Sequence, residues 1–281
     1  MSGFVILVVL GSALFHAAWN AVIKGGSDKL FETVMKTSGG GLFAACLLPF
    51  LPAPDPASWP YLAASAAIHV LYYLCIAYAY RGSDLGYAYT IMRGSSPLFI
   101  ALVAVFILGE AISPGGWLGV ILLSCGILTL VIDCIRRGQF SLPATFIALG
   151  NALVIMGYTV VDGSGVRLAG NTVSYICWVF FLNAFPILII AIILRQGEYF
   201  RYLKKRWIYG LFGGGCSFIA YGLSLWAMTR APIAMVAALR ETSVIFGVLL
   251  GVIFLKESLT ISRLVAVLLV MLGAMSMKVL T

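Results

Sequence analysis

The chain has 281 residues, of which 10% are charged and 62% hydrophobic, and its mean hydropathy is +1.06. A water-soluble globular domain is excluded, because such domains carry about 25% charged residues. The net charge of +8 comes from 18 basic and 10 acidic residues. In a chain this apolar, we assign the basic excess to loops that face anionic lipid rather than to nucleic-acid binding.

Uncharged runs bounded by charge, glycine or proline predict a series of transmembrane helices. Each run is close to the about 20 residues that cross a bilayer. The first run has no basic region before it and no cleavage site after it, so we expect it to remain as a helix rather than to be removed as a signal peptide. In chain order, the predicted helices cover residues 3–24, 30–51, 59–80, 86–108, 114–133, 143–162, 171–194, 207–229, 232–254 and 261–279.

Two of the predicted helices are copies of one another. The segment 92–113, MRGSSPLFIALVAVFILGEAIS, aligns without gaps with the segment 239–260, LRETSVIFGVLLGVIFLKESLT, at an offset of 147 residues. Seven positions are identical, among them Arg93 and Arg240. Identical leucines are common in such a composition, whereas identical arginines inside apolar helices are not. The alignment therefore indicates an internal repeat.

The repeat predicts how the chain is organised. We expect a five-helix repeat over residues 1–137, a linker over 138–142 and a second five-helix repeat over 143–281. Because five is odd, the second repeat must enter the membrane from the opposite side. Inverted repeats are typical of transporters that bind substrate near the bilayer midplane, between the halves. The predicted fold class is an all-α polytopic membrane protein with ten transmembrane helices in two inverted repeats.

The duplicated unit and the helix endings FILGEAIS and FLKESLT resemble the drug/metabolite transporter superfamily, in its ten-helix EamA-type branch. The resemblance covers nearly the whole chain and implies a transporter. In the second copy, Lys256 stands where the family pattern usually has glycine. The segments HAAWN (16–20), MRGSSP (92–97), YTVVDGSGVR (158–167) and LRETSV (239–244) also resemble a subgroup with members associated with phosphonate utilisation.

Ionisable side chains inside the predicted helices are the first candidates for a substrate site, because each costs about 2.5–3.5 kcal/mol at a helix centre. Arg93 lies about 10 Å into its helix, and Arg240 has the equivalent place in the second repeat. These arginines either bridge helices through backbone carbonyls or Glu241, or contact substrate. Lys36 is a third deep basic residue, but it lies near a helix start, where a long side chain can also reach the membrane surface.

Polar and aromatic stripes on other helices predict the rest of the site. His16, Trp19 and Asn20 share a face of the first helix, because their spacing is i, i+3 and i+4. Such stripes also occur as hydrogen-bond networks between helices or as packing, and Asp162 also fits a helix cap. The predicted substrate-binding set is His16, Trp19, Asn20, Tyr72, Tyr73, Arg93, Tyr158, Asp162, Tyr221, Trp226, Arg240 and Glu241.

Motifs for catalysis and metal binding are missing from the sequence. There is no GxxxxGK[ST] phosphate loop, no GxGxxG after a strand, no GxSxG and no HExxH, and the six cysteines form no CxxC pair. We therefore expect no enzyme activity, no cofactor and no metal. Without an ATP-binding motif, the energy source would be an ion gradient or the substrate gradient.

These observations predict a secondary transporter that carries a small zwitterionic or anionic metabolite, such as an amino acid or an aminophosphonate, by alternating access. The arginines would hold the anionic group, and Asp162 or Glu241 an amine or a proton. The alternatives are a broad-specificity drug exporter, an intramembrane enzyme acting on lipid-linked substrates and a lipid-carrier flippase. The expected partners are the substrate, protons and the lipid bilayer, with the chain acting as a monomer or a homodimer and without nucleic acid.

The distribution of basic residues over the loops predicts the orientation in the membrane. Twelve basic residues lie in or beside the odd-numbered loops, and three flank the other side. Loops rich in lysine and arginine face the cytoplasm. We therefore expect a multi-pass protein of the plasma membrane, the inner membrane of a bacterium, with both termini outside the cytoplasm.

Overall fold

The computed structural model describes residues 1–79, 85–136, 138, 140–255 and 260–279. Within these ranges the chain forms helices and no strand, which confirms the predicted all-α class. Short 3₁₀ turns, Leu48–Phe50 and Pro56–Ser58, lie between the second and third α-helices. The α-helices are α1 (Gly3–Gly25), α2 (Lys29–Leu47), α3 (Trp59–Ala79), α4 (Leu85–Phe106), α5 (Pro114–Arg136), α6 (Leu142–Leu168), α7 (Thr172–Met228), α8 (Ile233–Arg240), α9 (Ser243–Leu255) and α10 (Ile261–Val279).

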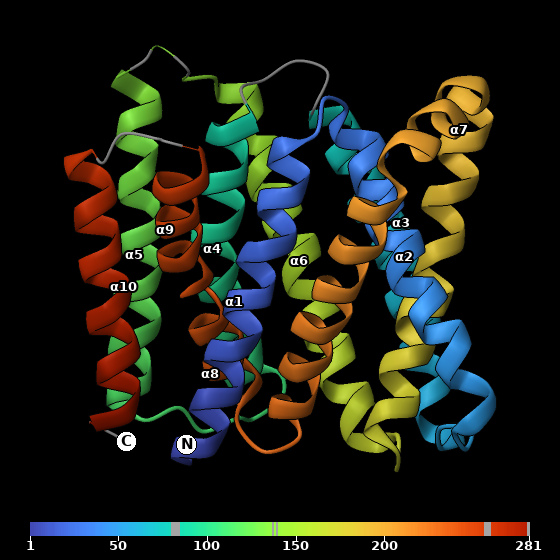
Figure 1. Cartoon of the computed structure of the whole chain (residues 1–281). Coiled ribbons are helices and arrows are strands. Elements are labelled where there is room, and N and C mark those ends of the chain that lie inside the picture. The colour runs from blue at the N-terminus through green and yellow to red at the C-terminus, as the bar shows by residue number, and fades with distance from the viewer. Residues whose placement is uncertain (80–84, 137, 139, 256–259, 280–281) are drawn as a thin grey trace.

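The helices run side by side between two edges of the molecule, and both termini lie at the same edge (Figure 1). Helix α1 starts at that edge, whereas α6 starts at the opposite one (Figure 1). The second half therefore enters the bundle from the opposite side, as expected of inverted repeats. Within the described residues, eight helical segments are long and apolar enough to cross a membrane. The more polar α2 and the helix α3 complete the ten crossings.

Helix α7 holds two crossings that meet at a bend. Arg195 has φ −151° and ψ 45°, which is outside the helical region. The second crossing begins at Gly197, so the predicted start at residue 207 is wrong. The intervening segment is an amphipathic helix: Lys204 and Lys205 are exposed, while Tyr199 is buried with its ring 5.6 Å from that of Phe31.

The predicted helix over 232–254 is wrong as a single element, because the chain breaks it into α8 and α9. The break follows Arg240, and α9 begins at Ser243. In the turn, the Thr242 hydroxyl donates to the carbonyl of Leu239 at 2.8 Å, and so satisfies one of the carbonyls that a helix end leaves free. Its repeat equivalent α4 continues through the corresponding position.

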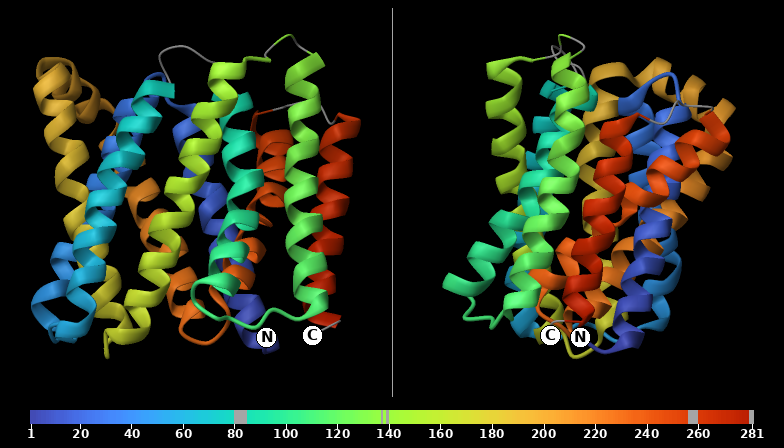
Figure 2. Two further views of the ribbon diagram at one scale, coloured as in Figure 1. Left: turned by 180° about the vertical axis from the view of Figure 1, so that it is seen from behind. Right: turned by 90° about the vertical axis from the view of Figure 1, so that its left-hand side faces the viewer.

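Close glycine contacts hold two pairs of helices together. In the α2–α7 pair, a Cβ at Gly39 would lie 2.6 Å from the carbonyl oxygen of Gly210. In the α5–α10 pair, a Cβ at Gly119 would lie 2.8 Å from the carbonyl oxygen of Gly273, and the reverse distance is also 2.8 Å. Figure 2 shows α5 and α10 side by side at one end of the bundle. The remaining helices surround the centre of the bundle.

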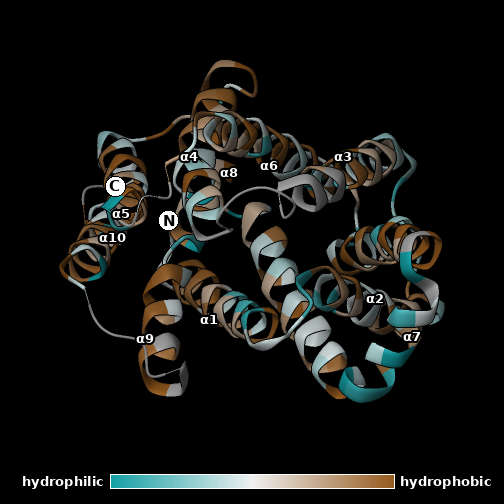
Figure 3. Cartoon of the chain, turned by 90° about the horizontal axis from the view of Figure 1, so that it is seen from above, coloured by the Kyte–Doolittle hydropathy of each residue, from teal (hydrophilic) through white to brown (hydrophobic). Residues whose placement is uncertain are grey.

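The outward faces of the bundle suit a lipid environment. Seen along the helices, hydrophobic residues dominate α5, α9 and α10, whereas hydrophilic residues gather at the bend of α7 (Figure 3). Large apolar side chains are exposed on these helices, for example Ile253 on α9 and Leu268 on α10. Exposed apolar surface of this extent needs a hydrocarbon partner. The chain is a multi-pass membrane protein.

Candidate functional site

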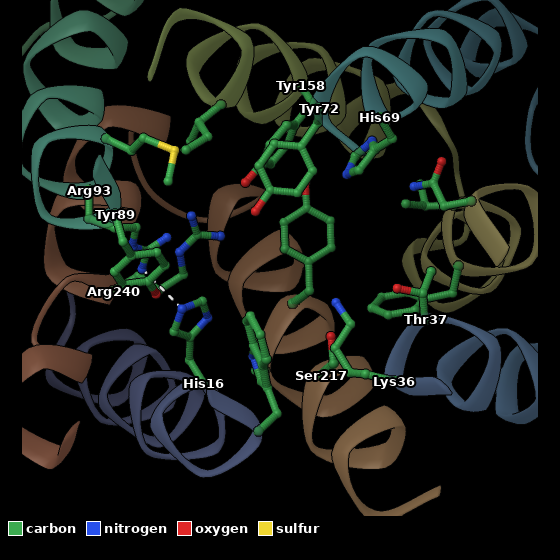
Figure 4. Close-up of a pocket in the computed structure, with 18 residues that line it drawn as sticks. His16, Lys36, Thr37, His69, Tyr72, Tyr89, Arg93, Tyr158, Ser217 and Arg240 are labelled. Atoms are coloured by element: carbon green, nitrogen blue, oxygen red, sulfur yellow. Dashed lines mark hydrogen bonds between the residues drawn. The ribbon is translucent and has the colours of Figure 1, made fainter. Parts of the chain in front are cut away.

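A cavity of about 100 Å³ lies between the two halves of the chain. Helices α1–α4 line it from the first half, and α6, both crossings of α7 and α8 line it from the second (Figure 4). Its lining residues are His16, Trp19, Lys36, Thr37, His69, Tyr72, Tyr89, Met92, Arg93, Ile155, Tyr158, Val179, Phe180, Asn183, Ser217, Ala220, Tyr221 and Arg240.

The structure brings most of the predicted substrate-binding set together around this cavity. The side chain of Tyr73 lies outside the described residues. Four others, described below, do not line the cavity. The members that do are His16, Trp19, Tyr72, Arg93, Tyr158, Tyr221 and Arg240.

Asn20 and Trp226 are displaced from the cavity by their own local partners. The Asn20 amide donates to the carbonyl of His16 at 2.7 Å, and its oxygen accepts from the Tyr89 hydroxyl at 3.2 Å. Trp226 stacks with the guanidinium of Arg230, at 4.8 Å from the ring centroid. Neither residue is among those that line the cavity. Residues that share one face of a helix cover a wider surface than the part of that face that borders the cavity.

Asp162 lies behind the cavity wall. Its side chain is completely buried, and it accepts hydrogen bonds from the Tyr221 hydroxyl at 2.6 Å and the Tyr175 hydroxyl at 3.3 Å. It does not line the cavity. The alternative role as a cap is wrong as well, because α6 continues to Leu168.

Glu241 also lies behind the wall, where it pairs with Arg93. The ion pair measures 2.9 Å, and the same guanidinium nitrogen of Arg93 donates to Nε2 of His16 at 3.1 Å. Arg93 therefore both bridges the two halves of the chain and lines the cavity. Glu241 compensates the charge of Arg93 and does not line the cavity.

Arg240 forms no such ion pair with any described residue, although Glu241 also interacts with it electrostatically. It is 3% exposed, and within the described residues no ion pair or hydrogen bond involves its guanidinium. Its guanidinium carbon lies 5.9 Å from the centroid of the Tyr221 ring. Arg240 and the adjacent Glu241 point in different directions because the helix breaks after α8. Arg240 faces the cavity, and Glu241 faces Arg93.

Lys36 points into the cavity from the side opposite to Arg93 and Arg240 (Figure 4). Its ammonium lies 4.6 Å from the centroid of the Trp19 ring, within the range of a cation–π contact. The alternative in which Lys36 reaches the membrane surface is therefore wrong. The position of Lys36 along the helix can be read from the sequence, but the direction in which its side chain points cannot.

Other lining residues carry weaker sequence signals. His69 shares a helical stripe with Tyr72, and its ring lies 4.5 Å from that of Tyr158. Ser217 shares a stripe with Tyr221, so helical spacing could have found both. Nothing in the sequence singled out Tyr89 or Asn183.

The charges around the cavity do not cancel. Three of the lining residues are basic, Lys36, Arg93 and Arg240, and none is acidic. One carboxylate, Glu241, pairs with Arg93 and also interacts electrostatically with Arg240, so it cannot neutralise all three charges. Within the described part of the chain, the site is therefore positively charged, and it offers hydroxyls from tyrosines to complete the hydrogen bonds of a ligand.

At the edge of the molecule that holds the termini, Glu110 fixes α8 in place. Its carboxylate accepts from the N–H of Ile233 at 2.8 and 3.1 Å and pairs with Arg167 at 2.7 Å. Arg167 also donates to two backbone carbonyls between α7 and α8, at 2.8 and 2.9 Å. The glutamate of the FILGEAIS ending thus holds the start of the helix whose end carries Arg240.

At the opposite edge, two ion-pair groups join the start of α2 to the bend of α7. Arg195 contacts Glu198 and, at 2.7 Å, Asp28. The hydrogen bonds that Arg195 donates to Glu198 and Asp28 raise the pKa of its guanidinium, which remains charged at any physiological pH. Arg206 pairs with Glu32. These groups tie the two helices together at the membrane surface.

Two inverted helical halves around a central polar cavity have the architecture of a membrane transporter of small molecules. The sequence profile of the EamA-like transporter family matches residues 3–132 and again residues 142–278. The chain belongs to this family, as the resemblance implied, and is a transporter of the drug/metabolite type.

Comparison with solved structures supports the same architecture. A structure titled "Crystal structure of protein" superposes with a TM-score of 0.75 over 100% of this chain and 98% of that chain, at 17% sequence identity. At this identity the likeness shows the fold alone. No curated protein matches the sequence.

Proposed function

We propose that the protein is a secondary transporter that moves a small organic anion, with a carboxylate or phosphonate group, across the membrane by alternating access. The observation that carries the proposal is the pair of cations, Lys36 and Arg240, that face the cavity without an acidic partner among the described residues. A charge withdrawn from water without a partner costs several kcal/mol. A bound anion removes this cost by supplying the partner.

The two cations suit different parts of one anionic group. The guanidinium of Arg240 can donate two parallel hydrogen bonds to a carboxylate or phosphonate, whereas the ammonium of Lys36 acts as a point charge. They approach the cavity from opposite sides (Figure 4). The hydroxyls of the lining tyrosines can complete the hydrogen bonds of the anion.

The position of the carboxylates favours an anion over a zwitterion. An amine needs an acceptor, and the sequence predicts Asp162 or Glu241 for that role. The first is engaged by two tyrosine hydroxyls and the second by Arg93, and neither lines the cavity. An amino acid or aminophosphonate would therefore place its ammonium group against a positively charged wall.

The size of the cavity argues against the alternatives of a drug exporter and a protein acting on lipid-linked substrates. Pockets for drug-sized ligands measure about 300–1,000 Å³, whereas this cavity has about 100 Å³. An exporter of lipophilic cations would also need an unpaired carboxylate, and no lining residue is acidic. The volume supports a substrate with few heavy atoms, and the lining argues against a lipophilic cation.

A matched pair of ligands tests the proposal. Ethylphosphonate and 2-aminoethylphosphonate differ by one amine, and their binding to the purified protein in detergent can be compared by calorimetry. We expect ethylphosphonate to bind more tightly, and Arg240→Gln and Lys36→Gln to weaken its binding. Lys205→Gln, at the exposed bend of α7, is the control and should leave it unchanged. Tighter binding of the aminophosphonate, or unchanged binding in both cavity variants, would contradict the proposal.

Transport itself is tested in liposomes. Ethylphosphonate that enters protein-containing vesicles should be recovered chemically unchanged, as a transporter requires. Conversion of the compound, or uptake no faster than in empty vesicles, would count against a transport function for this anion.

A further inference from the structure

Asp162 is a buried carboxyl group that the anion site leaves unused. It is completely buried, and it accepts hydrogen bonds from neutral donors, the hydroxyls of Tyr221, Tyr175 and Ser65. No ion pair reaches it from any residue that the structure describes. A carboxylate buried here has no positively charged partner, and burying an unpaired charge costs free energy. A bound proton neutralises the carboxylate and removes this cost.

Around Asp162, the helices α3, α7 and α8 contribute hydroxyl and apolar groups. From α3, the Ser65 hydroxyl faces it. From α8, Ile233 packs against the neighbouring Gly163. Farther along α6, Arg167 is held by Glu110. Helix α4 meets α6 at its other half, where Tyr87 and Met92 contact Thr145 and Asn151.

Tyr221 connects this carboxyl group to the anion site. It lines the cavity, its ring is 5.9 Å from the guanidinium carbon of Arg240, and its hydroxyl donates to Asp162 at 2.6 Å. A ligand that contacts Arg240 therefore lies one side chain away from Asp162. The phenol also offers a route for a proton between the cavity and a carboxyl group that does not touch the cavity.

We propose that Asp162 binds a proton that is carried together with the anionic substrate. This inference rests on the proposed function and adds its coupling ion. The phenol of Tyr221 gives its proton to Oδ2 of Asp162 and takes another from a hydronium ion that enters the cavity and becomes water, so one proton is bound and the phenol is restored. Anion binding adds negative charge beside Asp162, and repulsion between like charges favours the protonated carboxyl group. The loaded protein thus holds one anion and one proton.

Two transport measurements in liposomes separate coupling from binding. The first is counterflow, in which vesicles filled with unlabelled ethylphosphonate take up labelled ethylphosphonate without a pH gradient. The second is accumulation driven by a pH gradient of one unit, acidic outside, with an entrapped dye that reports proton entry. At one proton per anion, this gradient supports about tenfold accumulation.

We expect the wild-type protein to show counterflow, accumulation and proton entry. Asp162→Asn should keep counterflow, because Asp162 does not line the cavity, and should lose accumulation and proton entry. Asp133→Asn is the matched control: Asp133 also accepts two hydroxyl hydrogen bonds, from Thr260 at 2.6 Å and Ser262 at 2.8 Å, but lies away from the cavity. It should behave like the wild type.

The outcomes distinguish the inference from the function on which it rests. Without counterflow in the wild type, the proposed function fails and the inference with it. If the wild type shows counterflow but no proton entry, or if Asp162→Asn still accumulates the anion, the inference alone is overturned. Should Asp162→Asn not fold, proton uptake on addition of ethylphosphonate to the wild-type protein in weakly buffered detergent decides: no uptake overturns the inference.

Discussion

Arg93 and Glu241 form an ion pair of 2.9 Å that joins the two halves of the chain. Arg93 is the repeat equivalent of Arg240, and Glu241 directly follows Arg240, so a symmetric molecule would contain a second pair between Arg240 and residue 94. That residue is Gly94, and a Cβ there would lie 2.8 Å from a side-chain carbon of Leu128. The repeat therefore supplies two arginines and one carboxylate, which leaves Arg240 free to bind an anion.

The Arg93–Glu241 pair should show strong coupling in a double-mutant cycle. Both residues are buried, at 6% and 1% exposure, so Arg93→Gln or Glu241→Gln alone leaves a buried charge without a partner and should cost about 3–5 kcal/mol of unfolding free energy. The double variant should lose much less than the sum. Unfolding in detergent, followed by circular dichroism, measures the cycle. Additive losses would show that the two charges do not depend on each other.

Arg240→Lys should weaken anion binding although it keeps the charge. Lysine cannot reproduce the two parallel hydrogen bonds of a guanidinium, and the loss of a hydrogen bond to a charged group is typically about 1.5–3 kcal/mol. The dissociation constant for ethylphosphonate should rise about tenfold to 150-fold. Arg230→Lys, on the exposed guanidinium that stacks on Trp226, is the matched control. An unchanged dissociation constant in a folded Arg240→Lys protein would make Arg240 a structural residue.

Glu110→Ala should destabilise the protein more than an equivalent change at the surface. The carboxylate of Glu110 accepts from the first N–H of α8 and pairs with Arg167, which is 34% exposed in its side chain. Loss of the cap and of this partly screened ion pair should cost about 2 kcal/mol. The control is Glu198→Ala, whose pair with Arg195 is exposed on both sides and should contribute about 0–1 kcal/mol. Equal shifts of the two melting temperatures would contradict the capping role.

Comparison of the two repeats within the sequence identified the two arginines of the cavity, because the offset of the repeat marks equivalent deep positions. Arg93 and Arg240 were paired in this way, and both line the cavity. Helical spacing added His16 and Trp19, since residues three apart share a face. These predictions depend only on local geometry, which the sequence determines directly.

The sequence could not predict which way a side chain points across the bundle. Lys36 lies near a helix start, yet its ammonium reaches the cavity. Asp162 and Glu241 are deep and acidic, yet tyrosines and Arg93 hold them behind the wall. The directions of these three side chains depend on partners from distant helices. The break after Arg240 depends on such partners as well. Local propensity gave no sign of that break.

The orientation of the chain is the last prediction. In the structure, the α1–α2 turn, the bend of α7 and the start of α10 lie at the edge opposite both termini (Figure 1). The basic residues of these segments, Lys24, Lys29, Arg195, Arg201, Lys204, Lys205, Arg206 and Arg263, therefore share one edge, and Arg167, Arg230 and Lys278 belong to the other. Because loops rich in lysine and arginine are retained in the cytoplasm, we expect both termini outside it. Green fluorescent protein fused to the C-terminus should stay dark in a bacterial host, because it does not fold after export, while alkaline phosphatase at the same position should be active. A bright fluorescent fusion would place the basic edge outside and show that charge does not determine the orientation of this chain.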